Sequence, residues 1–295
     1  MMLFFLFLLI VLLQIVINSF LSPMPASDAG MVRYRSIPVM TLTLIFLNAI
    51  IFIVFEASAL YPGSSLLDEN PFDPQGIALV NRYFEVVWRF GYRALFMTQG
   101  QSVGAFVTFT SIFLHGDFWH LFYNMLFLWA FGRRVEDACG AWRYLLYYVL
   151  AGMIANLASV ALNPGRGDLP GIGASGAIAG VMGAYLILFP GALMTSFWGL
   201  GILLRVPVVF ILKTIVGMKA VQDAPLWRWT IRLPAWVLLI SFLIQNTLPS
   251  IITIQTGQEG GVDTLAHVAG FLSGLLVFLF VRKDLLMRYF AGRRI

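Results

Sequence analysis

The residues able to do chemistry are few, and they fall at three separated places in the chain. The histidines are His115, His120 and His267, and Ser175 lies within a glycine-rich run. A serine hydroxyl becomes a nucleophile when a base such as histidine lies within hydrogen-bond distance, and nearby N–H donors can stabilise the oxyanion that follows. Asn124, four residues after His120, would share a helix face with that imidazole. These residue types favour nucleophilic attack on a carbonyl, provided that the fold brings them together.

The composition indicates which kind of fold must position these residues. Apolar residues make up 60% of the chain and charged residues only 11%, whereas about a quarter of the residues in a soluble domain are charged. Several runs reach the ~20 apolar residues that a helix needs to cross a bilayer. None shows the alternation over about ten residues that is typical of a membrane β-strand. We therefore expect an all-α polytopic membrane protein that lies in a lipid bilayer.

Hydropathy predicts six membrane-spanning helices. Their approximate ranges are 37–56, 117–133, 142–162, 174–190, 234–254 and 264–282. If the segment before residue 37 is cytoplasmic, fifteen Lys and Arg residues fall inside and four outside, which together are the 19 in the chain. This is the positive-inside bias of a membrane protein. Because topology explains the net charge of +5, we expect no nucleic-acid partner.

The predicted organisation has three parts. They are an N-terminal apolar segment with a basic cytoplasmic linker (1–36), a helical core (37–283) and a basic cytoplasmic tail (284–295). Residues 3–22 are apolar enough for an extra transmembrane segment, although an uncleaved or misassigned start would look the same. The stretch 191–233 is interrupted by Arg205 and Pro207 and is interpreted as interfacial, because a span there would invert everything after it.

The alternating topology brings the candidate residues to one depth. The second, fourth and sixth helices all begin on the outer side, where Asp117 is a suitable N-cap for the helix that carries His120 and Asn124. Ser175 lies at the outer start of the fourth helix and His267 near the outer start of the sixth. One shared site is implied. The alternative is that each histidine separately caps a helix or lies at the level of the lipid headgroups.

Small residues indicate that the fourth and sixth helices touch. Gly176 and Gly180 have the small-xxx-small spacing of close helix contacts, and Gly270 and Gly274 repeat it. Close backbone contact would bring the serine within reach of the base. The spacing alone is common in membrane helices and indicates packing only.

Other kinds of site fit the sequence less well. His115 and His120 could bind a metal with Asp117, but their spacing puts the histidines about 140° apart on a helix, and the chain lacks H-E-x-x-H. Ala177 replaces the last glycine of the soluble-hydrolase elbow. The lone Cys139 has charged neighbours, which favours an exposed loop. We expect neither metal nor cofactor, and a transporter would carry polar residues through the whole depth.

Three ordered motifs resemble one family. The run His115-Gly-Asp-Phe-Trp-His120-Leu-Phe-Tyr-Asn124-Met, then Gly-Ala-Ser175-Gly, then Ala-His267-x-x-Gly270 is similar to the rhomboid family of intramembrane serine proteases. The resemblance extends over residues ~37–283 and includes Gly132-Arg-Arg-Val-Glu136. It implies a six-helix rhomboid-like bundle that forms the protease domain.

The resemblance also implies roles and partners. Ser175 would be the nucleophile and His267 the general base, while His120, Asn124 and the Ser175 amide would stabilise the oxyanion. His115 would support the site. A transmembrane helix hides its carbonyls in backbone hydrogen bonds, so we expect the substrates to be single-span transmembrane proteins with small or helix-breaking residues near their outer ends. The chain itself is expected to be a multi-pass protein of a prokaryotic cell (inner) membrane. The sequence contains nothing that sets the oligomeric state.

Three features depart from the family, and one of them is the extra N-terminal apolar segment, which is not part of the family core. Many members carry an aromatic residue four positions after the nucleophile, where it stacks on the base, but this chain has Ala179. The orientation of the imidazole must therefore come from elsewhere. The stretch between the fourth and fifth helices is also longer than expected. The alternative function is a non-catalytic rhomboid-like protein that binds transmembrane helices, although such a protein would be expected to lack the serine or the base.

Overall fold

The chain is mostly helical and forms two compact units. The computed structural model describes residues 24–28, 37–56, 74–99, 104–163, 169–197, 210–211, 214, 230–256 and 262–293. The smaller unit comprises Met1–Val32 and Gly191–Phe242, and the larger comprises Arg33–Pro190 and Leu243–Ile295. Every candidate site residue belongs to the larger unit.

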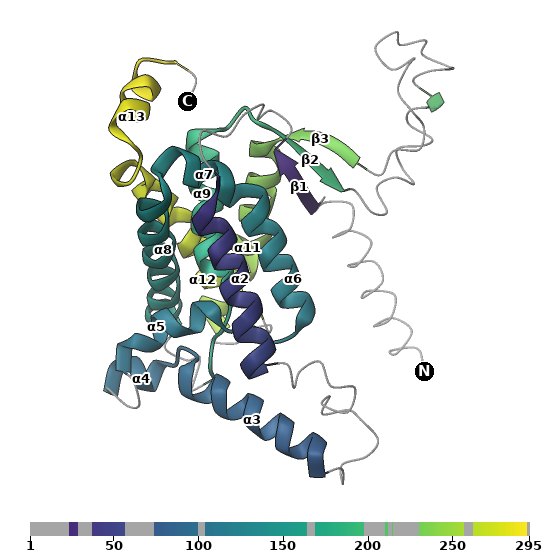
Figure 1. Cartoon of the computed structure of the whole chain (residues 1–295), viewed down its shortest axis with the longest axis vertical. Helices are drawn as coiled ribbons and strands as arrows, with labels where there is room; N and C mark the ends of the chain where they lie inside the picture. The colour runs from purple at the N-terminus through teal and green to yellow at the C-terminus, as the bar shows by residue number, and fades with distance from the viewer. Residues whose placement is uncertain are drawn as a thin grey trace. The chain divides into compact units, whose positions relative to one another are not determined.

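Helices make up the larger unit (Figure 1). In chain order they are α2 (Val39–Ile51), η1 (Phe52–Glu56), α3 (Pro74–Phe90), α4 (Ala94–Gln99), η3 (Gly104–Phe106), α5 (Val107–Thr110), η4 (Ser111–Phe113), α6 (Phe118–Phe127), η5 (Leu128–Gly132), α7 (Arg133–Cys139), α8 (Ala141–Leu162), α9 (Ser175–Leu188), the part of α11 (Ala235–Thr256) from Leu243 onward, α12 (Thr264–Leu272), η8 (Ser273–Leu279) and α13 (Lys283–Phe290).

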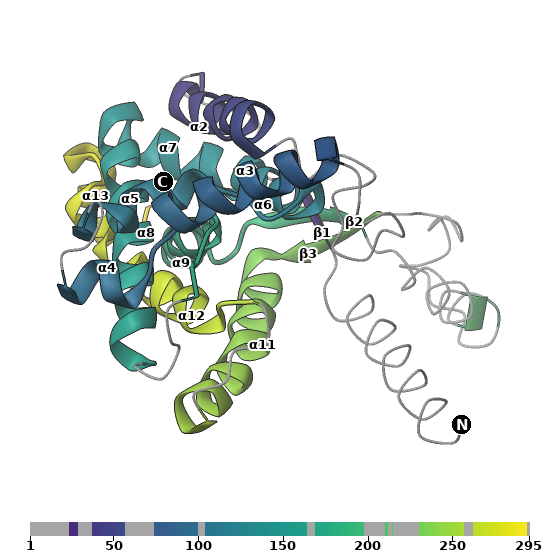
Figure 2. The same cartoon turned by 90° about the horizontal axis from the view of Figure 1, so that it is seen from below.

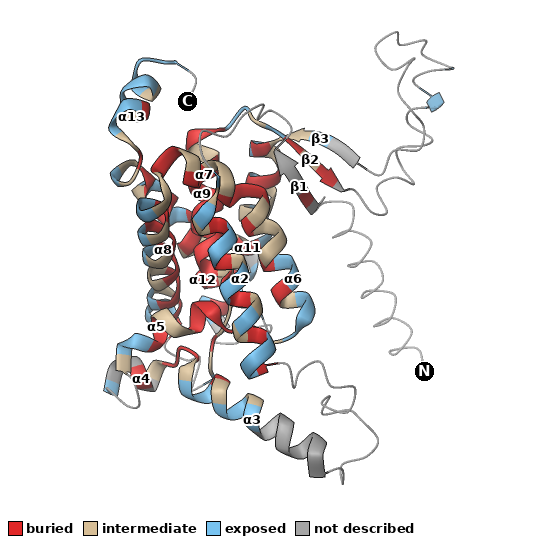
Figure 3. Cartoon of the chain, in the orientation of Figure 1, coloured by how far each residue is buried: buried red, intermediate tan, exposed pale blue. Residues whose placement is uncertain are grey.

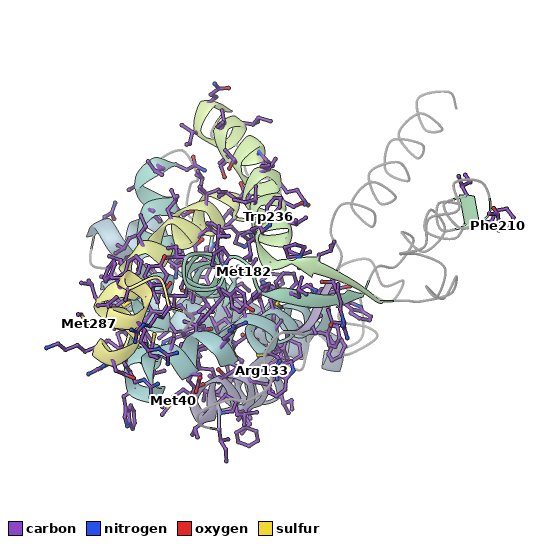
Figure 4. All side chains as sticks on the ribbon, turned by 90° about the horizontal axis from the view of Figure 1, so that it is seen from above. Met40, Arg133, Met182, Phe210, Trp236 and Met287 are labelled. Carbon is purple, nitrogen blue, oxygen red and sulfur yellow. The ribbon has the colours of Figure 1, made fainter. Side chains whose placement is uncertain are left out.

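The central helix of this unit is α9. Its sequence is rich in glycine and alanine, so that it is narrow enough to be packed closely against α8 and α12. Figure 2 shows it with α8, α12 and α6 around it. Met182, halfway along α9, is only 2% exposed and lies among the surrounding side chains in Figure 4. A helix without a polar face is typical of burial on all sides.

Burial follows the same arrangement. In Figure 3 α9 is buried along most of its length, whereas α2, α6 and α8 each have an exposed side. The exposed side is apolar, with Phe46 on α2 67% exposed and Trp142 on α8 75% exposed. Large apolar faces that point away from the protein are expected where lipid replaces water as the solvent.

Three helices in the described residues are long and apolar enough to cross a membrane. They are Val39–Glu56, Ala141–Leu162 and Ala235–Gln255, and a fourth is added if Thr264–Leu279 and Lys283–Phe290, bent by 102°, count as one span. Helical segments also occur at the other predicted ranges, as α6 with η5 and α9. The predicted extra segment at 3–22 lies outside the described residues.

The smaller unit contains a sheet that the all-α expectation missed. Strands β1 (Met24–Asp28), β2 (Leu193–Phe197) and β3 (Thr230–Pro234) form an antiparallel sheet in the order β1-β2-β3. The sequence Met-Pro-Ala-Ser-Asp of β1 has little intrinsic strand preference. Its pairing depends on β2, about 170 residues later. Of the stretch 191–233, the two ends therefore form strands, and most of the middle lies outside the described residues.

The exposed loop expected around Cys139 is wrong. Gly140 has a φ of +83°, which lets the chain turn directly from α7 into α8. The end of α7 is covered by the segment after η8, where the Arg282 N–H donates to the Ala138 carbonyl at 3.2 Å. Cys139 is only 1% exposed, and burial raises the pKa of its thiol to about 12. The charged neighbours therefore did not predict exposure.

Candidate active site

The segment that leads into α9 is fixed by backbone hydrogen bonds. Gly171 exchanges two bonds of 2.9 Å with Tyr92, and the Gly173 N–H donates to the Ser111 carbonyl at 2.9 Å. Helix α9 then begins at Ser175, and its N-cap residue, Ala174, makes no side-chain cap. The first N–H groups of α9 are therefore not used by a capping side chain, and they add partial positive charge beside the Ser175 hydroxyl.

Helices α9 and α12 meet backbone to backbone. A Cβ atom added at Gly270 would collide with the Gly176 carbonyl, and one at Gly274 would lie 2.5 Å from the carbonyl carbon of Gly183. One at Gly180 would lie 3.2 Å from the Gly270 oxygen. The glycines singled out by their spacing thus lie in this contact.

This contact aligns the two candidate catalytic residues. A Cβ atom added at Gly176 would lie 3.8 Å from the Ala266 oxygen and 3.9 Å from the Ala266 Cβ. Ser175 immediately precedes Gly176, and His267 immediately follows Ala266. The two residues therefore lie at the same level of the helix pair, and each is partly buried.

The start of α12 is held by a carboxylate. Asp263 is the N-cap of α12 and accepts from the Ala266 N–H at 2.9 Å. Its other oxygen accepts from the Ser159 hydroxyl at 2.6 Å and from the Tyr92 hydroxyl. His267 lies one turn further along α12, so these hydrogen bonds fix the position of the helical turn that carries its imidazole.

His120 lies beside Ser175 with a defined tautomer. The Asp117 side chain caps α6 by accepting from the His120 N–H at 2.9 Å, as expected from the sequence. The Gly116 N–H donates to His120 Nδ1 at 3.3 Å, so Nδ1 is an acceptor and the proton of the neutral ring is on Nε2. A Cβ atom added at Gly173 would lie 2.9 Å from that Nε2 and 3.5 Å from Ser175 Oγ. His120 Nε2–H and the Ser175 hydroxyl therefore both lie close to Gly173.

Asn124 carries a buried amide group whose Nδ2 is unbonded among the described residues. It lies one turn after His120 on α6 and is 7% exposed. Its Nδ2 has no hydrogen-bond partner within the described part of the chain. Asn156 on α8 is different, because its Nδ2 donates to the Thr108 carbonyl at 2.9 Å and to Ser111 Oγ at 3.0 Å. A buried amide without a partner is costly, and such groups cluster where a ligand completes the bonding.

His115 and Tyr83 complete the surroundings of α6. Burial, with a smaller contribution from His120, lowers the pKa of His115 to about 3, so its ring is neutral. That ring packs edge to face on His120 with ring centroids 5.2 Å apart, and the backbone N–H of His115 donates to Glu56 Oε2 at 2.9 Å. Burial, with Glu56 and Asp117, raises the pKa of Tyr83 to about 12, so its phenol keeps its proton. His115 thus packs against the ring of His120.

Sequence reasoning missed two residues that contact the site elements. Asn246 on α11 is 9% exposed, and its Oδ1 lies 2.8 Å from His267 Nδ1. The other is Asp263. Asn246 lies in the middle of a predicted span, where a polar residue is costly, so a complete inventory of polar residues within spans would have found it. Asp263, four residues before His267, fits the pattern of a helix N-cap.

Comparison with known proteins gives a consistent result. The model of the Rhomboid domain matches residues 104–284. Rhomboid protein 1 of Saccharomyces cerevisiae mitochondria is 33% identical over 114 residues, which are 37% of this chain and 33% of that protein. The rhomboid protease GluP of Bacillus subtilis is 44% identical over 77 residues, 26% of this chain and 14% of that protein.

A longer match is to the putative rhomboid protease YdcA of Bacillus subtilis, with 28% identity over 175 residues, 59% of this chain and 66% of that protein. The chain thus spans 66% or less of the length of each of these three curated relatives. The Rhomboid domain covers more than half of the chain, from before α5 to the start of α13, and includes Ser175 and His267. The chain belongs to the rhomboid family.

Proposed function

We propose that this chain is an intramembrane serine endopeptidase in which Ser175 is the nucleophile and His267 the general base. The observation that carries the proposal is the contact between α9 and α12, in which Gly176 and Ala266, the neighbours of Ser175 and His267, lie so close that a Cβ atom added at Gly176 would contact Ala266. Two relatives named as rhomboid proteases or putative rhomboid proteases support the reaction class. His120 and Asn124 would provide the oxyanion donors.

In the first step, Ser175 Oγ would form a bond to the carbonyl carbon of the scissile peptide while His267 Nε2 takes the hydroxyl proton. The oxyanion would accept from His120 Nε2–H, Asn124 Nδ2–H and the amides at the start of α9. The C–N bond would then break as His267 returns the proton to the leaving amine. In the second step, a water oxygen would bond to the acyl carbon while His267 takes a water proton. The ester bond between that carbon and Ser175 Oγ would then break as His267 returns the proton to Oγ, which releases the carboxylic acid product.

The length of α9 is consistent with a site below the membrane surface. Its 14 residues extend about 21 Å, less than the ~30 Å of the hydrocarbon core. The Ser175 end would then be recessed, and it would need a water-filled cavity open to the outer side for hydrolysis.

We further propose that all six predicted segments span the membrane and that residues 3–22 add an extra N-terminal span. Residues 37–283 would be the protease domain and 284–295 a basic cytoplasmic tail. The relatives include proteins of Bacillus subtilis and of mitochondria, and for this chain we propose a prokaryotic cell (inner) membrane. Chemical labelling of single cysteines placed in each loop tests this topology. Labelling of the 284–295 segment from outside would contradict it.

The substrate class follows from helix chemistry. A transmembrane helix hides its carbonyls in backbone hydrogen bonds, so a nucleophile reaches them only where the segment unwinds. We propose single-span substrates with small or helix-breaking residues near their outer ends. Bulky replacements at the P1 position should slow cleavage, and a panel of such replacements that leaves the rate unchanged would contradict this part.

The decisive experiment uses the purified chain in liposomes with a single-span model substrate. We expect cleavage by wild type and a loss of about 10⁴-fold or more for Ser175→Ala and for His267→Ala. Ser273→Ala is the matched control, since its hydroxyl bonds the Gly270 carbonyl in the same helix pair. Binding of the substrate without cleavage by wild type would instead favour the non-catalytic rhomboid-like reading.

A further inference from the structure

The imidazole of His267 has a hydrogen-bond partner on a third helix. Asn246 Oδ1, on α11, lies 2.8 Å from His267 Nδ1. Oxygen can only accept, so Nδ1 carries the proton of the neutral ring and Nε2 keeps its lone pair. This is the tautomer that a general base needs when it takes a proton through Nε2.

The nucleophile helix cannot supply this orientation. Residue 179, one turn after Ser175, is alanine and is fully buried. A Cβ atom added at Gly270 would lie 3.3 Å from the Ala179 Cβ, so the space beside α12 at that level is filled by small residues and backbone. No aromatic ring from position 179 covers the imidazole, and the ring must be held from another side.

Helix α11 combines exposed isoleucines with one buried polar stripe. Ile244, Ile251 and Ile252 are exposed, whereas Asn246, Ser250 and Thr253 are buried at helical spacing. The Ser250 hydroxyl donates to the Asn246 carbonyl at 2.7 Å within the same helix. A polar amide in a membrane helix is expensive unless it is bonded, and here one of its partners is the ring of His267.

We propose that Asn246 is a positioning residue, which holds His267 in the tautomer and orientation that present Nε2 to Ser175. The inference rests on the proposed protease function and deepens it. The amide is neutral, so it orients the imidazole without supplying the charge of the aspartate in a Ser-His-Asp triad. Asn246 would therefore raise kcat by increasing the fraction of molecules in which His267 has the tautomer and orientation that accept the proton.

Three variants test the proposal in the full-length chain in liposomes. Asn246→Leu keeps the branching of the side chain and removes the acceptor, Asn246→Asp keeps an acceptor in a side chain of the same shape, and Thr247→Val is the control. The control removes a hydroxyl that donates to Leu243 O, in the same turn of α11. We expect Asn246→Leu to lower kcat by about 10- to 100-fold, less than the ~10⁴-fold of a charged triad partner, with KM nearly unchanged.

The conservative variant separates positioning from a general structural role. Asn246→Asp should recover most of the lost kcat, and the acid limb of its kcat profile should move to higher pH, because a carboxylate stabilises the protonated ring. Asp263 on α12 and His120 on α6 are the other titratable groups that act on His267, and they are unchanged in this series. A loss of kcat that Asp fails to recover, or a change confined to KM, would overturn the proposal.

A readout that needs no cleavage separates this inference from the proposed function. The chain has three histidines, so ¹⁵N spectra of histidine-labelled protein resolve the ring tautomers, with His267→Ala giving the assignment. We expect a protonated Nδ1 and an unprotonated Nε2 at His267 in wild type, and a mixture in Asn246→Leu. If wild type cleaves nothing, the proposed function fails while this test still decides the hydrogen bond. A protonated Nε2 in wild type, or identical spectra for both proteins, sinks the inference.

Discussion

The two sides of His267 are built in different ways. Towards α9, glycines bring the two backbones together, and a side chain at Gly270 would strike the Gly176 carbonyl. Towards α11 and α6, the site is approached by single polar side chains, Asn246 and Asn124, on helices with exposed apolar faces. The first contact sets the depth of the proposed nucleophile and base, and the second sets the orientation of their polar groups.

This difference teaches which property each side controls. A close backbone contact cannot adjust to an added side chain. Protein interiors are densely packed, so even one added methyl group lowers the stability. A polar side chain can be removed with little change in packing, but it takes its hydrogen bond with it. Substitutions on the glycine side should therefore lower stability first, and substitutions on the polar side should lower the rate first.

Among substitutions that compare the glycine side with the polar side, the largest effect is expected from Asn124→Ala, because loss of one oxyanion donor lowers kcat by about 10²- to 10³-fold. Its Nδ2 has no partner in the described structure, so the melting temperature should change little. Asn156→Ala is the matched control, since that amide bonds Thr108 and Ser111. We expect it to lower the melting temperature more than Asn124→Ala does. Cleavage rates and thermal melts in the same detergent measure both, and the reverse pattern would break the comparison.

A somewhat smaller effect is expected from Gly270→Ala. The added methyl group would meet the Gly176 carbonyl, and such overpacking typically costs about 1–3 kcal/mol of stability. Gly191→Ala is the control, because a Cβ atom there meets nothing within 4 Å. Thermal melts should show a lower midpoint for Gly270→Ala alone. An unchanged midpoint would show that α9 and α12 do not depend on close contact.

Tyr92→Phe should lower both the stability of the fold and the rate of cleavage, each by a modest amount. It removes one hydrogen bond to Asp263, which keeps its bonds to Ser159 and the Ala266 N–H, so we expect a loss of roughly 1 kcal/mol in stability. Because His267 follows one turn later, kcat should also fall a few-fold. Denaturant titration and cleavage assays on the same preparation measure both. A fall in kcat with unchanged stability would show that Asp263, like Asn246 and Asn124, affects the rate of cleavage more than the stability of the fold.

The smallest effect is expected from metal removal. In the proposed reaction all proton transfers use His267, so incubation with a chelator should leave the cleavage rate unchanged. The assay compares rates before and after chelation, with Ser175→Ala beside it. Cleavage that is abolished by chelator but persists in Ser175→Ala would instead indicate a metal-dependent reaction with His115 and His120 as metal ligands.

Local signals in the sequence predicted much of the site. The Asp117 cap, the helix that begins at Ser175 and the four-residue spacing of His120 and Asn124 depend on neighbours along the chain, and the structure has each of them. Contacts between distant segments were not predictable in the same way. The bond between Asn246 and His267 and the sheet of β1, β2 and β3 join residues that only the folded chain brings together.

The burial of Cys139 shows a related limit. Its charged neighbours are in the same stretch, but the covering segment around Arg282 comes more than 140 residues later. The charges of neighbouring residues indicate whether a turn lies near the surface on average. The exposure of one side chain also depends on which distant segment packs against it. The domain boundaries proposed from the sequence remain predictions.

Tyr92 connects the approaches to both proposed catalytic residues. Its backbone pairs with Gly171, four residues before Ser175, and its hydroxyl bonds Asp263, four residues before His267. A detergent or lipid change that loosens the segment around Tyr92 would therefore release both sides of the site together. On heating, cleavage activity should then be lost before the helices melt. The loss of activity should follow a single exponential in time, because one segment holds both proposed catalytic residues in place.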